Sequence, residues 1–144
     1  PPRSTLFPYT TLFRSCQLIE QNLDDYIQHM GQMRDRLEAG LRREIPGVRV
    51  NGHPEKRLPN TSSVSFKDQE ANTILDKLQS VAASAGAACH ADRIDVSAVL
   101  KAMNLPIEYA MGTIRLSVGR HTTEDEIDRA VQEIADVIRV QSHV

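Results

Sequence analysis

The sequence lacks three features that would point to particular partners. It has no basic excess, since its net charge is −2, and proteins that bind nucleic acid normally carry one. It has no apolar run near the roughly 18 residues needed to cross a membrane. It has only two cysteines, which is too few for a disulfide framework. We therefore expect no nucleic-acid partner and no membrane partner, and we expect a location in the reducing cytoplasm.

What the chain does contain is typical of a globular protein. Its 144 residues are 40% hydrophobic and 25% charged, and this length predicts one domain with its own core. No internal repeat or low-complexity linker divides it. Residues 1–15 (PPRSTLFPYTTLFRS) are the exception, because they show neither a helical period nor strand alternation. They resemble a translated adapter sequence, so we expect a non-native tail, with a native irregular arm as the alternative.

Periodicity predicts the secondary structure of the first half. Apolar residues spaced by three and four predict a helix over residues 17–45, with a possible break at Gly31 and an end at Pro46. Short strands are expected over residues 48–50 and 61–66, and in the second strand Val64 and Phe66 share one face while Ser63 and Ser65 share the other. A helix follows over residues 69–80, with Asp68 as its expected N-cap.

The second half continues the same mixed pattern. We expect a weak strand over residues 81–84, a loop that contains Cys89, short helices over residues 97–103 and 106–111, and a strand over residues 113–118 that alternates with Ile114, Leu116 and Val118 toward the core. Thr122 or Thr123 caps a final helix, and Asp125 or Glu126 completes its capping box. The expected buried residues of this helix are Ile127, Val131, Ile134 and Ile138. The fold class is therefore α/β of the α+β kind, with a small sheet covered by helices.

Cys89 is the first candidate for chemistry. It lies in the run A-S-A-G-A-A-C-H-A-D, whose small side chains leave a sulfur accessible. A thiolate is a strong nucleophile, but an isolated cysteine is more often a buried or incidental thiol. His90 is adjacent, although adjacent side chains usually diverge. A metal site made of Cys89, His90 and Asp92 is a weak alternative, because the spacing matches no zinc pattern, and we expect no metal.

Arg115 is the second candidate, in the strand-like run G-T-I-R-L-S-V-G-R. A guanidinium group matches a carboxylate with two parallel hydrogen bonds. Arg115 is therefore either paired with an Asp or Glu of the fold or free to bind a ligand, and the residues alone leave both open. Asn60, in R-L-P-N-T, is interpreted as a turn residue that bonds the backbone, with a smaller chance of lining a site.

These segments together resemble the C-terminal small domain of pyridoxal-phosphate-dependent cysteine desulfurases and selenocysteine lyases, in the class-V aminotransferase family. The resemblance runs from about Met30 to about Arg139. It implies a small domain of a fold-type I enzyme over residues 16–144, with a short, mostly antiparallel sheet. It also implies that the large domain, which binds pyridoxal 5'-phosphate, is missing, so that the isolated chain is inactive and exposes apolar surface.

The resemblance further implies a mechanism. Cys89 takes sulfur from L-cysteine as a persulfide, alanine is released, and Arg115 binds the substrate carboxylate. His90 and Asn60 are candidates for lining the site. The persulfide then passes to a sulfur acceptor or an iron–sulfur scaffold protein, and the full-length enzyme is a homodimer. The segment between Cys89 and Arg115 resembles the long mobile cysteine loop of one desulfurase class.

Three alternatives stay open. The residues G-A-A-C-H around Cys89 resemble the selenocysteine-lyase branch, for which L-selenocysteine would be the substrate. The chain could instead be a non-catalytic α/β interaction module that binds a sulfur-carrier protein. It could also be a different thiol enzyme that uses Cys89 and His90.

Overall fold

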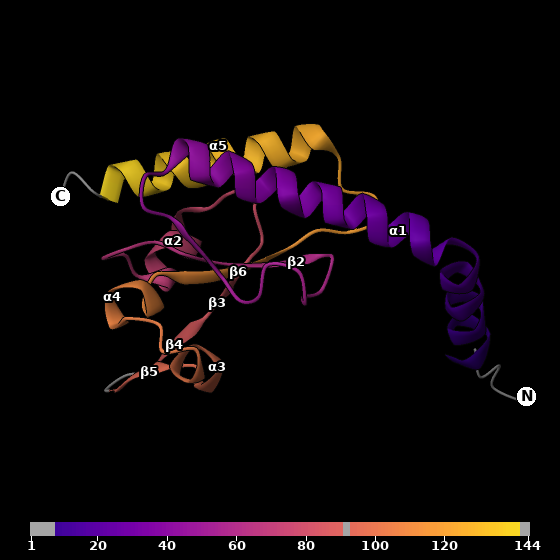
Figure 1. Cartoon of the computed structure of the whole chain (residues 1–144), viewed down its shortest axis with the longest axis horizontal. Helices are drawn as coiled ribbons and strands as arrows, with labels where there is room; N and C mark the ends of the chain where they lie inside the picture. The colour runs from indigo at the N-terminus through magenta and orange to yellow at the C-terminus, as the bar shows by residue number, and fades with distance from the viewer. Residues whose placement is uncertain (1–7, 91–92, 142–144) are drawn as a thin grey trace, which may run out of the picture.

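A four-stranded sheet forms the middle layer of the molecule (Figure 1). The computed structural model describes residues 8–90 and 93–141, and the side chains of residues 8–12 and 87–95 lie outside this description. The strand order is β1-β2-β6-β3, and every neighbouring pair is antiparallel. Two long helices, with the short helix α2 (Ala71–Lys77) beside the second of them, cover one face, and the other short helices and a hairpin lie toward the other. The predicted antiparallel sheet covered by helices is confirmed.

The elements have the following bounds. The sheet contains β1 (Arg49–Asn51), β2 (Thr61–Ser65), β3 (Ser84–Ala85) and β6 (Thr113–Ser117). The helices are α1 (Pro8–Glu44), α2 (Ala71–Lys77), α3 (Ala98–Ala102), α4 (Ile107–Ala110) and α5 (Glu124–Gln141). A separate hairpin pairs β4 (Ala87–His90) with β5 (Arg93–Val96).

The core lies between the sheet and the pair of helices α1 and α5. Val64, Ile114 and Leu116 point from the sheet into this core, where they are buried. The two helices approach each other closely, because a Cβ at Gly40 would lie 2.7 Å from Val131 Cγ2. Each fully buried aliphatic side chain contributes about 1.5–3 kcal/mol, so burial of these side chains decides which face of the sheet the helices cover.

Helix α1 differs from its expected beginning. It begins at Pro8, so the start predicted at residue 17 is wrong, and Gly31 does not break it, whereas the non-native origin proposed for residues 1–15 stays a prediction. Once a helix has formed, each added residue costs little, which lets it continue through a sequence without an apolar period. The first half extends past α5 (Figure 1), and Ile19, Leu23 and Ile27 there are 48%, 47% and 42% exposed. This is exposed apolar surface of the kind that the sequence predicted.

Helix α2 is shorter than expected, and Asp68 is not its N-cap. The helix begins after Glu70, and Asp68 adopts a positive φ of 56°. The cause is a tertiary contact, because the Phe66 amide donates to the Gly112 carbonyl at 3.1 Å and the Asp68 amide donates to Glu108 at 2.8 Å. These bonds hold residues 66–70 in a non-helical path and override the local helical pattern.

The hairpin β4–β5 replaces the loop that was expected around Cys89. Cys89 pairs with Ile94 in an antiparallel register. Of the weak strand expected over residues 81–84 only the last residue is in a strand, the two-residue β3 (Ser84–Ala85). The small residues at 82–88 have a low propensity for strands, so the sequence pattern could not distinguish a hairpin from a loop.

Helix α5 begins as predicted. The Thr123 amide donates to Glu126 Oε2 at 2.8 Å, and the Glu126 amide donates to Thr123 Oγ1 at 3.3 Å. This is a capping box. The hydrogen bonds from the Thr123 backbone and hydroxyl lower the pKa of Glu126. The predicted buried residues of α5 (Ile127, Val131, Ile134 and Ile138) are all buried.

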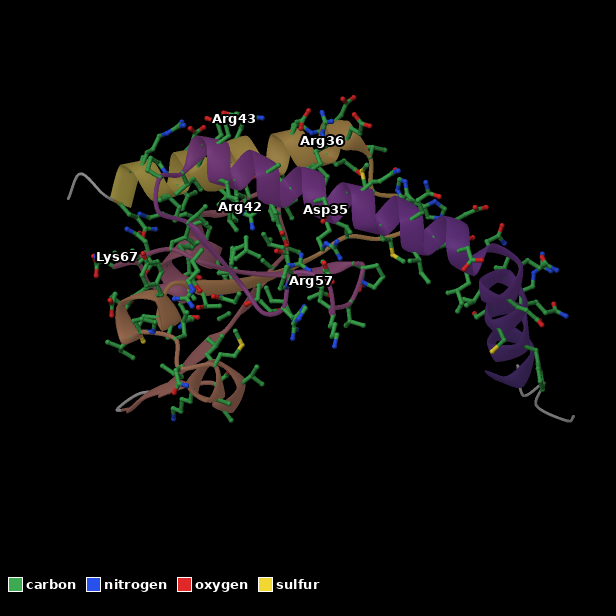
Figure 2. The ribbon with its side chains drawn as sticks, viewed as in Figure 1. Asp35, Arg36, Arg42, Arg43, Arg57 and Lys67 are labelled. Atoms are coloured by element: carbon green, nitrogen blue, oxygen red, sulfur yellow. The ribbon has the colours of Figure 1, made fainter. Side chains whose placement is uncertain are left out.

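A buried ion pair ties α1 to β2 and to the segment before it. Glu38, 5% exposed, pairs with Arg57 and accepts a hydrogen bond of 2.7 Å from Ser62 Oγ. Figure 2 shows Arg57 on the sheet side of α1, whereas Arg36 and Arg43 lie on the helix's outer side. The pair therefore fixes where the chain enters β2.

We predict that Glu38→Ala destabilises the fold by about 3–5 kcal/mol, because it leaves the Arg57 guanidinium buried without its carboxylate. The control is Asp35→Ala on the same helix, since the Asp35 side chain is 66% exposed and its removal costs at most about 0.5 kcal/mol. Urea denaturation of the two variants measures both values. Equal effects would contradict the structural role of the pair.

Candidate active site

Arg115 lies in the middle of the sheet, on the face away from α1 and α5. Its neighbours Ile114 and Leu116 point into the core, so strand alternation places Arg115 on the opposite face. In the register of the sheet, Arg115 stands between Ser63 on β2 and Ser84 on β3. Its side chain is exposed.

The guanidinium of Arg115 has no carboxylate partner among the described side chains. Its one hydrogen bond runs from Nη2 to Ser84 Oγ, at 3.5 Å. Other arginines of the chain do form ion pairs, such as Arg36 with Asp128 at 2.7 Å and Arg139 with Glu44 at 3.0 Å. Of the two alternatives that the sequence left open, this favours a guanidinium that is free to bind a ligand.

The hairpin that carries Cys89 begins beside Arg115. The Gly86 amide donates to the Thr113 carbonyl at 2.7 Å, and a Cβ at Gly86 would lie 2.7 Å from Thr113 Cγ2. Glycine is therefore needed where the chain leaves β3 for β4. Cys89 follows Ser84 by a few residues, so its Cα lies within about 17 Å of the strand position next to Arg115. The Cys89 thiol itself lies outside the described side chains, so its role stays a prediction.

The other two predicted residues do not stand beside Arg115 in the sheet. Asn60 is in the turn before β2, where its carbonyl accepts from the Val118 amide at 2.9 Å and its Oδ1 accepts from Thr61 Oγ1 at 3.2 Å. Asn60 is therefore not one of the residues directly opposite Arg115 in the sheet, which are Ser63 and Ser84. The backbone of His90 is in β4, but its side chain lies outside the description, as does residue Asp92 of the weak metal alternative. Neither site role is tested.

Sequence reasoning missed a set of polar residues on the same face of the sheet. Asn51, Ser65 and Thr113 are each at least nine-tenths buried and hydrogen bond to one another. Alternation in the sequence indicated that Ser63 and Ser65 point away from the core. Only the strand register could reveal that they stand in rows with Asn51, Arg115 and Thr113.

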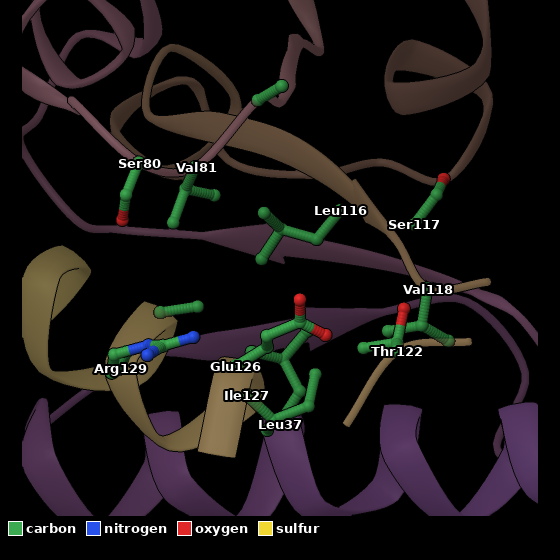
Figure 3. Close-up of a pocket in the computed structure, with 12 residues that line it drawn as sticks. Leu37, Ser80, Val81, Leu116, Ser117, Val118, Thr122, Glu126, Ile127 and Arg129 are labelled. Carbon is green, nitrogen blue, oxygen red and sulfur yellow. The ribbon is translucent and has the colours of Figure 1, made fainter. Parts of the chain in front are cut away.

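A groove of about 570 Å³ lies elsewhere, between β6, the start of α5 and residues 80–82 (Figure 3). Its floor contains Leu37, Leu116 and Ile127, which are on the core side of the sheet. Glu126 at its rim is already bound in the capping box. Arg115 does not line this groove, so we do not assign the chemistry to it.

The described residues do not fit a pyridoxal phosphate site. Such a site needs a lysine that forms a Schiff base, usually a desolvated one. All four lysines of the chain (Lys56, Lys67, Lys77 and Lys101) are exposed. In the described parts no cluster of three or more His, Cys, Asp or Glu side chains could hold a metal ion. No described helix is long and apolar enough to cross a membrane.

The comparisons identify the class of protein. A family model for aminotransferase class-V matches residues 11–130, and the chain belongs to this family. Cysteine desulfurase NifS of Azotobacter vinelandii is 43% identical over 108 residues, which cover 74% of this chain and 27% of that protein. Cysteine desulfurase 2 of Trichormus variabilis is 40% identical over 129 residues, which cover 88% of this chain and 32% of that protein.

Solved structures agree with this relationship. A NifS-like protein has a TM-score of 0.75 and 27% identity, and the match covers 88% of this chain and 32% of that one. A NifS-like protein from Rickettsia africae, 22% identical with a TM-score of 0.72, shares the fold. The chain thus corresponds to a part of cysteine desulfurase-like enzymes and spans about a third or less of the curated relatives it matches. The family generally depends on pyridoxal phosphate.

We predict that the purified chain forms no stable lysine adduct with equimolar pyridoxal phosphate, because no described lysine is desolvated. Borohydride reduction followed by mass spectrometry measures the adduct. A full-length member of the class-V aminotransferase family, treated in the same way, serves as the positive control, because the family generally depends on pyridoxal phosphate. A stoichiometric adduct on Lys56, Lys67, Lys77 or Lys101 of the isolated chain would contradict the prediction.

Proposed function

We propose that this chain supplies the sulfur-accepting cysteine and the carboxylate-binding arginine of a cysteine desulfurase. The observation that carries the proposal is the position of Arg115, which is exposed in mid-sheet without a carboxylate partner among the described side chains. The strand that contains Cys89 begins at Ala87, directly after Gly86, whose amide donates to Thr113, two residues before Arg115 on β6. Relatives named cysteine desulfurase support the same assignment.

Arg115 would hold L-cysteine by its carboxylate through two parallel hydrogen bonds, which a lysine cannot form. This would fix one end of the substrate while its thiol points away from the sheet. Binding through the carboxylate also gives specificity for amino acids over simple thiols, because the guanidinium would otherwise lack a partner.

Cys89 would act as the nucleophile, in its thiolate form. The thiolate attacks the substrate sulfur, a sulfur–sulfur bond forms, and the bond between that sulfur and the substrate β-carbon breaks. The β-carbon takes up a proton, so the products are alanine and a persulfide on Cys89. We place the pyridoxal phosphate in the part of the relatives that this chain does not span.

The hairpin would then deliver the sulfur. It is bonded to the sheet at Gly86 and makes no other described strand pairing with it, so it can pivot at its base. We propose a sulfur-acceptor or iron–sulfur scaffold protein as the receiver, in a cytoplasmic homodimeric enzyme. The exposed apolar residues of α1, Ile19, Leu23 and Ile27, would pack against the rest of that enzyme.

Selenocysteine lyase activity is the second candidate, favoured by the run G-A-A-C-H around Cys89. The same two residues would serve it, with selenium as the abstracted atom. Relative rates with L-cysteine and L-selenocysteine decide between the two activities.

In the full-length protein we predict that L-cysteine and a reductant yield sulfide and alanine. Cys89→Ala should abolish both products, and Arg115→Lys should lower kcat/KM about tenfold to a hundredfold, mainly through KM. Cys16→Ala is the thiol control, since Cys16 is exposed on α1. Arg120→Lys is the arginine control, since Arg120 lies over Tyr26.

Full activity in Cys89→Ala would contradict the proposal. If the parent protein has no activity with either L-cysteine or L-selenocysteine, the result would favour a non-catalytic interaction module. Thiol reactivity of Cys89 that needs no cofactor would instead favour a different thiol enzyme.

A further inference from the structure

Four polar residues stand in one row across the sheet, on the face that carries Arg115. The register pairs Asn51 with Ser63, Ser63 with Arg115, and Arg115 with Ser84. Directly opposite residues on one face have Cβ atoms about 4.5–5.5 Å apart. Ser63 and Ser84 therefore flank the guanidinium on its two sides.

A chain of hydrogen bonds runs through the next row of the sheet, which contains Ser65 and Thr113, and each bond in it can have only one direction. It ends at the Tyr109 carbonyl, which can only accept, so Thr113 Oγ1 must donate to it, at 3.0 Å. Thr113 Oγ1 then accepts from Ser65 Oγ, at 2.7 Å. Since Ser65 has used its proton, it must accept from Asn51 Nδ2, also at 2.7 Å.

The fixed direction of these bonds also determines the hydrogen bonding of Ser63. The amino end of Asn51 is fixed by Ser65, and its Nδ2 also lies 3.3 Å from Ser63 Oγ, so it donates there as well. Asn51 is 6% exposed, and its Oδ1 is left buried without a partner, as expected if the amino end is held in place. Ser63 thus accepts from Asn51 and keeps its own proton, which it donates to no described residue.

The same holds on the other side of Arg115. Ser84 Oγ accepts the long hydrogen bond from Arg115 Nη2, so its proton is also free. The guanidinium therefore stands between two hydroxyl groups, each with a proton to donate. A ligand that only accepts hydrogen bonds, such as a carboxylate, matches this arrangement.

We infer that Ser63 is a further substrate-binding residue, which donates a hydrogen bond to the carboxylate held by Arg115. Asn51, Ser65 and Thr113 are positioning residues that set the direction of the Ser63 proton. This inference rests on the proposed function, because it takes the substrate carboxylate as the ligand of Arg115.

The test is steady-state kinetics on the full-length holoenzyme. Ser63→Ala should lower kcat/KM for L-cysteine roughly tenfold or more, through KM, since a hydrogen bond to a charged group is lost. Ser63→Thr keeps the hydroxyl and should stay within about threefold of the parent. Ser117→Ala is the matched control, because Ser117 is exposed on the same face of β6, two residues from Arg115.

The methyl ester of L-cysteine separates recognition of the carboxylate from a merely structural effect. The ester lacks the negative charge, so its KM should change less than about twofold in Ser63→Ala. Equal losses for acid and ester, or no loss for the acid, would overturn the inference. The Arg115→Lys variant is measured in the same assay. If its KM for L-cysteine is unchanged, the proposed function fails. If KM rises in Arg115→Lys but not in Ser63→Ala, only the role of Ser63 is rejected.

Discussion

The pairing of β6 with strands on both of its edges is the constraint on which the site depends. Ile114 is fully buried and Leu116 nearly so, and a slip of one residue would turn both toward solvent. Burial of these two side chains therefore fixes Arg115 on the other face. The hydrophobic core decides the position of a charged group that is not part of it.

The same strand also fixes the base of the cysteine hairpin. Thr113 accepts from Gly86 through its backbone and joins the buried polar residues through its hydroxyl. One rigid element thus holds the arginine, orders its polar neighbours and anchors the segment that leads to Cys89. The roles proposed for Arg115 and Cys89, a fixed binding group and a tethered nucleophile, suit an enzyme that takes an atom from a small substrate and passes it on.

Much of the fold was predictable because it follows from local patterns. The alternation of Ile114, Leu116 and Val118 predicted β6, and Thr123 with Glu126 predicted the start of α5. Asp68 is not the N-cap, because hydrogen bonds donated to the Gly112 and Glu108 carbonyls hold its segment in another path. Arg115 was a candidate from its sequence context, but Asn51 and Ser63 were not, since only the pairing of distant strands places them in its row.

The most direct test of the account is mass spectrometry of the Cys89 peptide from the full-length protein after brief exposure to L-cysteine without reductant. The account predicts that this peptide gains one sulfur atom, that the Cys16 peptide does not, and that one alanine is released for each persulfide formed. Alanine release without sulfur on Cys89 would contradict it, because the sulfur would then have been taken by another group.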